Sequence, residues 1–290
     1  MPQVSVNGTD LYWEERGAGA PLLFIHGMCG NANVWDGQVQ RLSPRFHCIA
    51  YDRRGHTRSP LGSISERSVE LHADDAALLI EALGIAPCLL VASSGGARIG
   101  VDMLRRYPDL LRGAVLSEPP LFGLDPEGAR VVMAELRPLL EQAMNGGGPR
   151  SAVDAFFAYM CPGLWATLDD QAREPYRANH VELFGDLQMP PYQITTDDLR
   201  NIRVPSLIVT GSESHPLLRR VASLLAENIP TADLIELEGS GHVTYAEKPE
   251  EFARAVTVSP GFSRRRFSRS GSRTSSSSRT SRPSTCYRST

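Results

Sequence analysis

The sequence predicts an α/β fold in which a mostly parallel sheet carries helices on both faces and is interrupted by an inserted helical segment. Three observations lead to this prediction. Short apolar runs of strand length alternate with amphipathic stretches of helix length, as in repeated strand–helix units. The alternation stops between residues 121 and 196 and then resumes. A chain of 290 residues has room for one large domain with such an insertion.

The first strands are predicted from residue alternation and from continuous apolar runs. Gln3–Val6 and Leu11–Arg16 alternate around Asn7-Gly8-Thr9-Asp10, which predicts a β-hairpin. Pro21–His26 and Phe46–Tyr51 are continuous apolar runs, as expected of strands that are buried on both faces.

Helices are expected between and after these strands. Asn33–Leu42 has helical spacing, and Ser68–Leu83 carries apolar residues on one side and acids on the other. Gly84 is expected to end the second of these helices. Arg98–Tyr107 predicts a third helix, followed by a strand at Gly113–Ser117.

The middle of the chain, residues 121–196, breaks the alternation. Helical segments are expected around Ala129–Met144 and Ser151–Met160, separated by Gly146-Gly147-Gly148-Pro149. Eight of the twenty aromatic residues fall in this region. We therefore expect residues 121–196 to form a mostly helical cap.

Strand–helix alternation resumes after the insertion. Pro205–Thr210 and Asp233–Leu237 are predicted strands, with helices at Leu217–Glu227 and from about Pro249 to Val256. Residues 1–120 and 197–258 together are therefore expected to form the core of the fold.

Composition excludes several classes of function. The chain is 41% hydrophobic, yet no stretch approaches the ~20 apolar residues of a membrane-spanning helix, so we expect no membrane association. We expect no signal peptide, and the five cysteines lack metal-like spacing, which indicates free thiols and a cytoplasmic location. The net charge of −3 includes eight arginines in residues 262–290, so residues 1–261 carry −11, and an acidic body does not favour nucleic-acid binding. We expect a monomer or homodimer.

The last 29 residues, 262–290, follow no pattern of strands or helices. They contain eight arginines and no acid, and they lack apolar periodicity, so we expect this tail to be disordered. Because the break falls inside an expected terminal helix, one hypothesis is that the tail is an out-of-frame reading of the original 3′ end. The alternative is a genuine basic arm.

The apolar run at Leu89–Ala92 ends in two serines and two glycines, Ser93-Ser94-Gly95-Gly96. This pattern predicts a strand that turns sharply into a helix, the geometry of a nucleophile elbow. The turn requires small residues two before and two after the nucleophile. With Ser94 as nucleophile these positions hold Ala92 and Gly96, both small. With Ser93 the first position would hold the β-branched Val91, which fits the turn poorly. Ser94 is the predicted nucleophile, and an ordinary strand–loop–helix connection is the alternative.

Two glycine-rich loops are expected to supply the other groups that a nucleophile at this elbow needs. His26-Gly27-Met28-Cys29-Gly30-Asn31 follows a buried strand and can direct the Met28 N–H, with that of Gly95, toward an oxyanion. His26 itself is expected to be a structural histidine bonded to loop backbone. Gly239–Val243 carries His242 at the carboxyl end of a strand, where open α/β sheets place their sites. His242 is the predicted general base, against the alternative of a solvated loop histidine.

With these stretches in this order and spacing, the chain resembles the α/β-hydrolases. The resemblance covers the chain from the first hairpin to about residue 257 and implies an eight-stranded type of sheet, a Ser–His–acid triad and a cap over the pocket. Ala92 departs from the glycine that is usual there. The matching residues are His26-Gly27, Asp52-Arg53-Arg54-Gly55-His56-Thr57-Arg58-Ser59, Ala92-x-Ser94-x-Gly96 and Gly241-His242.

The acid of the triad is the second departure. Most of the family places it shortly after the strand that here ends at Thr210, and by that pattern its position holds Ser214. Glu213 lies one residue out of register and remains an alternative. We expect the acid to be Glu118, which follows the neighbouring strand. Its place, 24 residues after Ser94, resembles that in zearalenone-type lactonases, and certain haloalkane dehalogenases also have their acid there. A structural salt bridge is the alternative role for Glu118.

These assignments predict a serine hydrolase. Ser94 attacks an ester carbonyl while His242 takes its proton and Glu118 orients the imidazole. The amides of Met28 and Gly95 bind the oxyanion. Water then hydrolyses the acyl-enzyme, and no metal or organic cofactor is required.

The cap is expected to select the substrate, a small and mainly apolar carboxylic ester or lactone. A cofactor-free perhydrolase or C–C hydrolase uses the same triad and stays open. A non-catalytic ligand receptor on the same fold is disfavoured by the intact serine and histidine. The predicted substrate contacts are Phe122, Phe156, Trp165 and Phe184.

Overall fold

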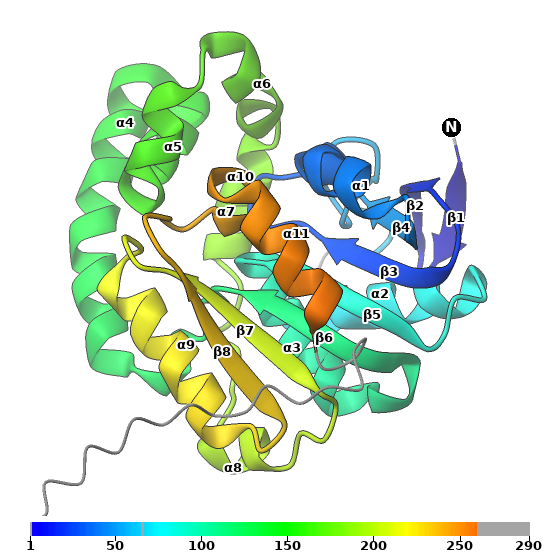
Figure 1. Ribbon diagram of the computed structural model, residues 1–290. Coiled ribbons are helices and arrows are strands. Elements are labelled where there is room, and N and C mark those ends of the chain that lie inside the picture. The colour runs from blue at the N-terminus through cyan, green and yellow to red at the C-terminus, as the bar shows by residue number, and fades with distance from the viewer. Residues whose placement is uncertain (1, 65–66, 260–290) are drawn as a thin grey trace, which may run out of the picture.

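The computed structural model describes residues 2–64 and 67–259 (Figure 1). Within these residues one sheet has the strand order β1-β2-β4-β3-β5-β6-β7-β8. β2 pairs antiparallel with β1 and β4, and the other neighbours are parallel, which confirms the predicted mostly parallel α/β sheet. The strands are β1 (Gln3–Val6), β2 (Thr9–Arg16), β3 (Ala20–Ile25), β4 (Phe46–Tyr51), β5 (Cys88–Ser93), β6 (Leu111–Ser117), β7 (Ser206–Gly211) and β8 (Ala232–Leu237).

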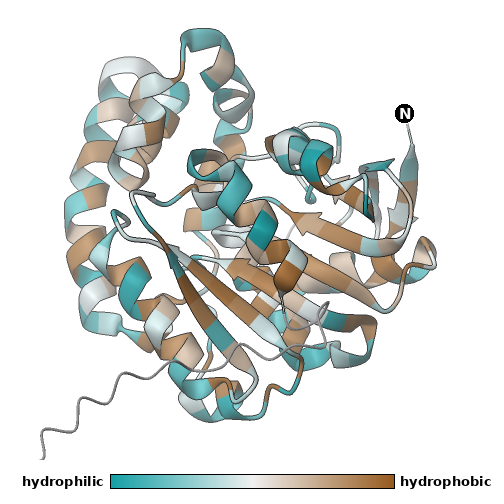
Figure 2. Cartoon of the chain, in the orientation of Figure 1, coloured by the Kyte–Doolittle hydropathy of each residue, from teal (hydrophilic) through white to brown (hydrophobic). Residues whose placement is uncertain are grey.

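Helices cover both faces of this sheet. Neighbouring residues of the central strands belong to two separate apolar clusters, which explains their continuous apolar runs. On β3, Leu23 and Ile25 join a cluster with α2, α3 and α9, whereas Leu22 and Phe24 join another with α1 and α11. Figure 2 shows the central strands as mainly hydrophobic ribbons behind α11. The helices are α1 (Asp36–Leu42), α2 (Val69–Ala82), α3 (Gly95–Arg106), α9 (Pro216–Asn228) and α11 (Pro249–Val258), with the 3₁₀ turns η1 (Ala32–Trp35) and η2 (Pro108–Leu110).

The described chain between β6 and β7 has no strand, and residues 121–196 are called the helical insertion below. Figure 1 shows α4, α5 and α6 gathered at one end of the sheet. α4 leaves helical geometry at Gly148 (φ 76°, ψ −167°), inside the glycine–proline stretch where a break was predicted. The elements are η3 (Phe122–Leu124), α4 (Pro126–Met160), α5 (Pro162–Thr167), α6 (Asp170–Ala178) and α7 (His180–Leu187), followed by α8 (Thr196–Arg200).

Local signals explain where several elements begin and end. The hairpin turn holds Asn7 at φ 46° and Gly8 at φ 75°, the positive angles that a tight two-residue turn requires. The Ser68 side chain caps α2 by accepting from the Leu71 N–H. Gly84 follows the end of α2 with φ 64°, as predicted.

Some expectations fall outside the described residues. The tail at 262–290 is one of them, so its disorder stays a prediction.

Cys29, Cys48, Cys88 and Cys161 are buried free thiols. In the part of the chain that the structure describes, no helix is long and apolar enough to cross a membrane.

Candidate active site

Ser94 lies at the sharp turn between β5 and α3. Its backbone has φ 53° and ψ −125°, a conformation that costs energy for any residue with a side chain. The Ser94 N–H donates to the Ser117 carbonyl on β6 at 2.8 Å and helps to hold this turn. A Cβ on Gly96 would lie 2.4 Å from the Ile25 carbonyl oxygen, so only glycine fits at this position. The small-residue pattern that selected Ser94 therefore has a direct steric cause.

Three side chains form a continuous hydrogen-bonded chain from this turn. Ser94 Oγ lies 3.0 Å from His242 Nε2. His242 Nδ1 lies 2.6 Å from Glu118 Oε2 on its other side. Glu118 is fully buried and His242 is 7% exposed. If Nδ1–H donates to the carboxylate, Nε2 is free to accept the serine proton.

Glu118 follows β6 with φ 48°, and its N–H donates to the Val209 carbonyl at 3.0 Å. Oε1 of its carboxylate accepts from Thr210 Oγ1 at 2.8 Å and from the Gly211 N–H at 2.9 Å. Oε2 accepts from Ser214 Oγ at 2.6 Å besides the histidine. Four donors therefore surround a carboxylate that has no contact with solvent, and they stabilise its negative charge.

The structure brings Glu118, and not Glu213, to the histidine. Glu213 is exposed, and among the described contacts its carboxylate makes no hydrogen bond to His242. Ser214 is the residue that the neighbouring loop places against the Glu118 carboxylate. The carboxylate that contacts His242 therefore comes from the residue that follows β6.

The loop that carries His242 is held by a second carboxylate that the sequence patterns did not single out. Glu247 ends the short helix α10 (Thr244–Glu247). Its two oxygens accept the N–H groups on either side of the histidine, Gly241 at 2.7 Å and Val243 at 3.1 Å. Ser117 Oγ also lies 2.7 Å from Thr244 Oγ1, which ties the loop to the end of β6.

The loop after β3 approaches the elbow, as predicted. A Cβ on Gly27 would lie 3.0 Å from Ser94 Cβ. The Met28 nitrogen lies 3.5 Å from the point that a Cβ on Gly95 would occupy. Within the described residues the Met28 N–H has no acceptor, and Gly95 is the first residue of α3, where the N–H has no intrahelical acceptor. The two amides thus lie at the elbow without an acceptor among the described residues.

His26 has the structural role that was expected of it. Its Nδ1 lies 2.8 Å from the Gly27 carbonyl, and its Nε2 accepts from the Arg53 N–H at 2.9 Å. Burial, followed by the charge of Arg53, lowers the pKa of His26 to about 3, so the ring is neutral. Both ring nitrogens are occupied by backbone groups, and the ring is not available as a base.

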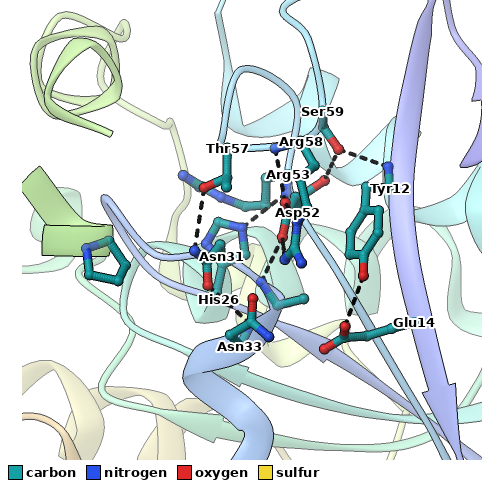
Figure 3. A network of polar contacts seen from close by, with 12 residues as sticks. Tyr12, Glu14, His26, Asn31, Asn33, Asp52, Arg53, Thr57, Arg58 and Ser59 are labelled. Atoms are coloured by element: carbon teal, nitrogen blue, oxygen red, sulfur yellow. Dashed lines mark hydrogen bonds and ion pairs between the residues drawn. The ribbon is translucent and has the colours of Figure 1, made fainter. Parts of the chain in front are cut away.

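Asp52 fixes the base of the same loop. Figure 3 shows Arg58 reaching back to Asp52, with Nε 2.6 Å from Oδ2 and Nη2 2.8 Å from Oδ1. The Ala32 N–H donates to Asp52 Oδ1 at 2.7 Å, at the end of the loop that carries Met28. Ser59 Oγ donates to the Asp52 carbonyl and accepts from the Tyr12 N–H. The motif Asp52–Ser59 is therefore a structural support beneath the site.

A narrow pocket with a cavity volume of about 40 Å³ lies against Ser94 and His242. No Asp, Glu, Lys or Arg is among its described lining residues. Burial raises the pKa of the Cys161 thiol and of the Tyr176 phenol to about 12 each, so both are neutral at pH 7. The lining residues are Gly27, Met28, Gly30, Val34, Ser93, Ser94, Phe156, Phe157, Cys161, Leu164, Trp165, Leu168, Tyr176, His242, Val243 and Tyr245.

Of the four predicted substrate contacts, the structure places Phe156 and Trp165 on this pocket. Phe122 and Phe184 are not among its lining residues and instead pack, partly buried, against the apolar cluster of the helical insertion. Phe157 lies on the pocket and stacks on Trp165 with ring centroids 4.6 Å apart. Residue type alone does not distinguish the two faces of these helices.

The described residues contain no group of three His, Cys, Asp or Glu side chains that could hold a metal ion.

A model of the α/β hydrolase family matches residues 22–255. The chain belongs to the α/β hydrolase family.

Several known proteins are similar to this α/β hydrolase over most of its length. A protein of Azorhizobium caulinodans provisionally named carbamate hydrolase RutD is 28% identical over 259 residues, covering 87% of this chain and 95% of that protein. A 2-(acetamidomethylene)succinate hydrolase of Mesorhizobium japonicum is 28% identical, with coverage of 88% and 93%. The structure of a thermophilic esterase from Thermogutta terrifontis superposes with a TM-score of 0.71 at 23% identity, covering 88% and 97%.

Proposed function

We propose that this α/β hydrolase cleaves uncharged, mainly apolar carboxylic esters or lactones through an acyl-enzyme formed on Ser94. The observation that carries the proposal is the hydrogen-bonded chain from Ser94 through His242 to the buried Glu118, at the wall of an apolar pocket. A hydroxyl, a base and an orienting carboxylate in this order are the groups that acyl transfer requires.

In the proposed first half-reaction, His242 takes the proton of Ser94 as Oγ attacks the ester carbonyl. The Glu118 carboxylate stabilises the imidazolium that forms. The carbonyl oxygen becomes an oxyanion and accepts from the N–H groups of Met28 and Gly95, which are worth about 3–4 kcal/mol per donor in other serine hydrolases. His242 then gives its proton to the departing alkoxide, and the alcohol leaves.

In the second half-reaction water takes the place of the alcohol. His242 removes a proton from the water, the hydroxide attacks the acyl carbon, and Ser94 Oγ leaves with that proton. The products are a carboxylic acid and a free serine, so no oxidant, reductant or cofactor is consumed.

The substrate class is proposed from the lining of the pocket. A pocket without charged side chains binds an uncharged apolar group better than a carboxylate, because a charge buried there would have no partner. Most of its aromatic lining comes from the helical insertion, so we assign residues 121–196 as a cap on the core formed by residues 1–120 and 197–258. The name esterase of the Thermogutta terrifontis protein supports ester cleavage.

Carbamates and amides are the second candidate class, favoured by the names of the two relatives, a carbamate hydrolase and a 2-(acetamidomethylene)succinate hydrolase. They use the same triad with a nitrogen leaving group.

We also propose that the protein is cytoplasmic, since Cys29, Cys48, Cys88 and Cys161 are free thiols.

The test is steady-state hydrolysis of p-nitrophenyl butyrate by the wild type, Ser94→Ala and the control Ser223→Ala. Ser223 lies on α9, and among the described contacts its hydroxyl bonds only the Arg219 carbonyl one turn earlier. We expect turnover by the wild type and the control and none above background for Ser94→Ala. Wild-type turnover retained by Ser94→Ala would contradict the proposed nucleophile.

A second substrate tests the proposed class. Mono-p-nitrophenyl glutarate carries a carboxylate at the end of an acyl chain of similar length. We expect it to have the lower kcat/KM. A preference for the charged ester would contradict the substrate class while leaving the Ser94 mechanism intact.

A further inference from the structure

The helical insertion reaches the oxyanion loop through one buried side chain, Asn179. This residue lies between α6 and α7 and is 4% exposed. Its amide nitrogen lies 3.1 Å from the Cys29 carbonyl oxygen and 3.0 Å from that of Gly30. Carbonyl oxygens can only accept, so these contacts identify the amide nitrogen as the donor on this side.

The other side of the Asn179 amide holds a second loop. Its Oδ1 accepts from the Thr57 N–H at 2.9 Å and lies 3.2 Å from Thr57 Oγ1. Thr57 belongs to the Asp52–Ser59 segment that supports the oxyanion loop from below. One side chain of the insertion therefore bridges both core loops that shape the site.

Two of the three residues that Asn179 contacts in these loops have unfavourable backbone conformations. Cys29 has φ 54° and Thr57 has φ 45°, in a region that non-glycine residues adopt at a cost. Such conformations persist only where surrounding contacts hold them. Met28 precedes Cys29 directly, so the contacts that hold Cys29 also restrict the conformations open to the loop at Met28.

Two ion pairs hold helix α7 of the insertion against the core, next to Asn179. Asp186 on α7 forms an ion pair with Arg53 at 2.8 Å, and both side chains are almost fully buried. Glu182 on the same helix pairs with Arg67 at 2.5 Å. Together with Asn179, these contacts fix the start and the body of α7 against the core.

We propose that Asn179 is a positioning residue of the oxyanion hole, which holds residues 27–31 in the conformation that directs the Met28 N–H toward the oxyanion. This inference rests on the proposed function for the role of Met28. It makes the insertion part of the catalytic apparatus as well as a wall of the pocket. Disturbing Asn179 then lowers kcat, because the transition state loses a donor, and leaves KM nearly unchanged.

The test compares Asn179→Asp with the wild type and the control Asn228→Asp. Asp at 179 keeps the shape and the acceptor for Thr57, but it turns an oxygen toward the carbonyls of Cys29 and Gly30. Asn228 lies on α9, and its amide donates to the Leu224 carbonyl at 2.8 Å. The readouts are kcat and KM for p-nitrophenyl butyrate and amide hydrogen exchange of the peptide containing residues 27–31, followed by mass spectrometry.

For Asn179→Asp we expect kcat to fall by about 10- to 100-fold, KM to change by less than about threefold, and the 27–31 peptide to exchange faster. Asn228→Asp should match the wild type in all three. A kcat within about threefold of the wild type, or a rise in KM alone, overturns the inference.

Asn179→Ala serves as a second variant, because it removes the amide without bringing in a charge, and thermal unfolding reports the folded fraction of each protein. A loss of kcat that matches the unfolded fraction also overturns the inference. A wild type that does not turn over esters contradicts the proposed function. In that case the hydrogen-exchange measurement still tests whether Asn179 holds residues 27–31 in place. Unchanged exchange of the 27–31 peptide in both Asn179 variants refutes this role.

Discussion

Ser214 Oγ lies 2.6 Å from Glu118 Oε2, and both side chains are buried. Ser214 occupies the place after β7 at which the family resemblance locates the acid, yet it donates to a carboxylate that comes from the end of β6. β6 and β7 are parallel neighbours, so their carboxyl ends lead to the same point beside His242. The histidine can therefore be oriented from either strand, and this chain uses a carboxylate from one and a hydroxyl from the other.

Glu118→Gln should lower kcat by about 10⁴-fold, as the corresponding acid-to-amide change does in a serine protease. The amide cannot stabilise the imidazolium and can hold the histidine in the wrong tautomer. The change is nearly isosteric, so the protein should still fold. The measurement is kcat at one pH, with thermal unfolding as the check on structure.

Glu213→Gln is the matched control, because Glu213 is exposed and lies two residues from the Gly211 amide that bonds Glu118. It should retain nearly the full rate. A large loss for Glu213→Gln together with near wild-type activity for Glu118→Gln would return the acid to the loop after β7.

Ser214→Ala removes one of four donors from a buried carboxylate, and we expect the free energy of unfolding to fall by about 1–3 kcal/mol. kcat should fall by far less than in Glu118→Gln, since the carboxylate remains. Ser214→Thr keeps the hydroxyl and should restore most of both quantities. Urea denaturation and steady-state kinetics measure them, and a Ser214→Ala protein as stable as the wild type would show that this hydrogen bond contributes nothing.

Glu247→Gln should lower kcat by about tenfold through the position of the histidine loop. The carboxylate accepts both flanking N–H groups, whereas an amide can accept only one and turns its own N–H toward the other. Glu251→Gln on α11 is the control, since Glu251 is exposed. Equal rates for the two variants would mean that the His242 loop keeps its conformation without this carboxylate.

Acid should destabilise the fold through its buried histidines. Burial, followed by the charge of Arg53, lowers the pKa of His26, His56 and His72, to about 3 for His26. The unfolded chain protonates these rings near pH 6.5, so below that pH it binds more protons than the folded chain. Stability is therefore greatest above pH 6.5 and decreases by up to about 1.4 kcal/mol per pH unit for each ring.

The measurement is the thermal unfolding midpoint at pH 7.5, 6 and 5, and we expect it to fall at each step. Asp75 and Glu182 act in the opposite direction, because burial raises the pKa of both carboxyls. Their effect begins as the pH falls through the raised folded-state pKa of each carboxyl and is complete below the ordinary carboxyl pKa. A midpoint that is constant or rises between pH 7.5 and pH 5 would contradict the neutral state of the buried rings.

The sequence predicts those parts of the fold and site that depend on local rules. Continuous apolar runs mark strands buried on both faces, and the steric demand at Gly96 points to Ser94 instead of Ser93. The glycine–proline stretch around Gly148 predicts the break in α4. Each of these signals lies within a few residues of the feature that it predicts.

Contacts between distant segments could not be predicted in this way. Asn179 meets Cys29 across 150 residues, and no pattern in either segment reveals the partner. The helix that carries Glu247 has four residues, too few to show a helical period. Phe184 was a plausible contact by residue type, but no residue of α7 is among those lining the pocket, and the placement of α7 depends on how the insertion packs.

The central claim is that Ser94 is the nucleophile, and covalent labelling tests it most directly. The wild-type protein is treated with a fluorophosphonate, digested, and the modified peptide is sequenced by mass spectrometry. We predict a single adduct on Ser94, with loss of p-nitrophenyl butyrate hydrolysis in proportion to labelling. An adduct on Ser93, or full inactivation with Ser94 unmodified, would contradict it.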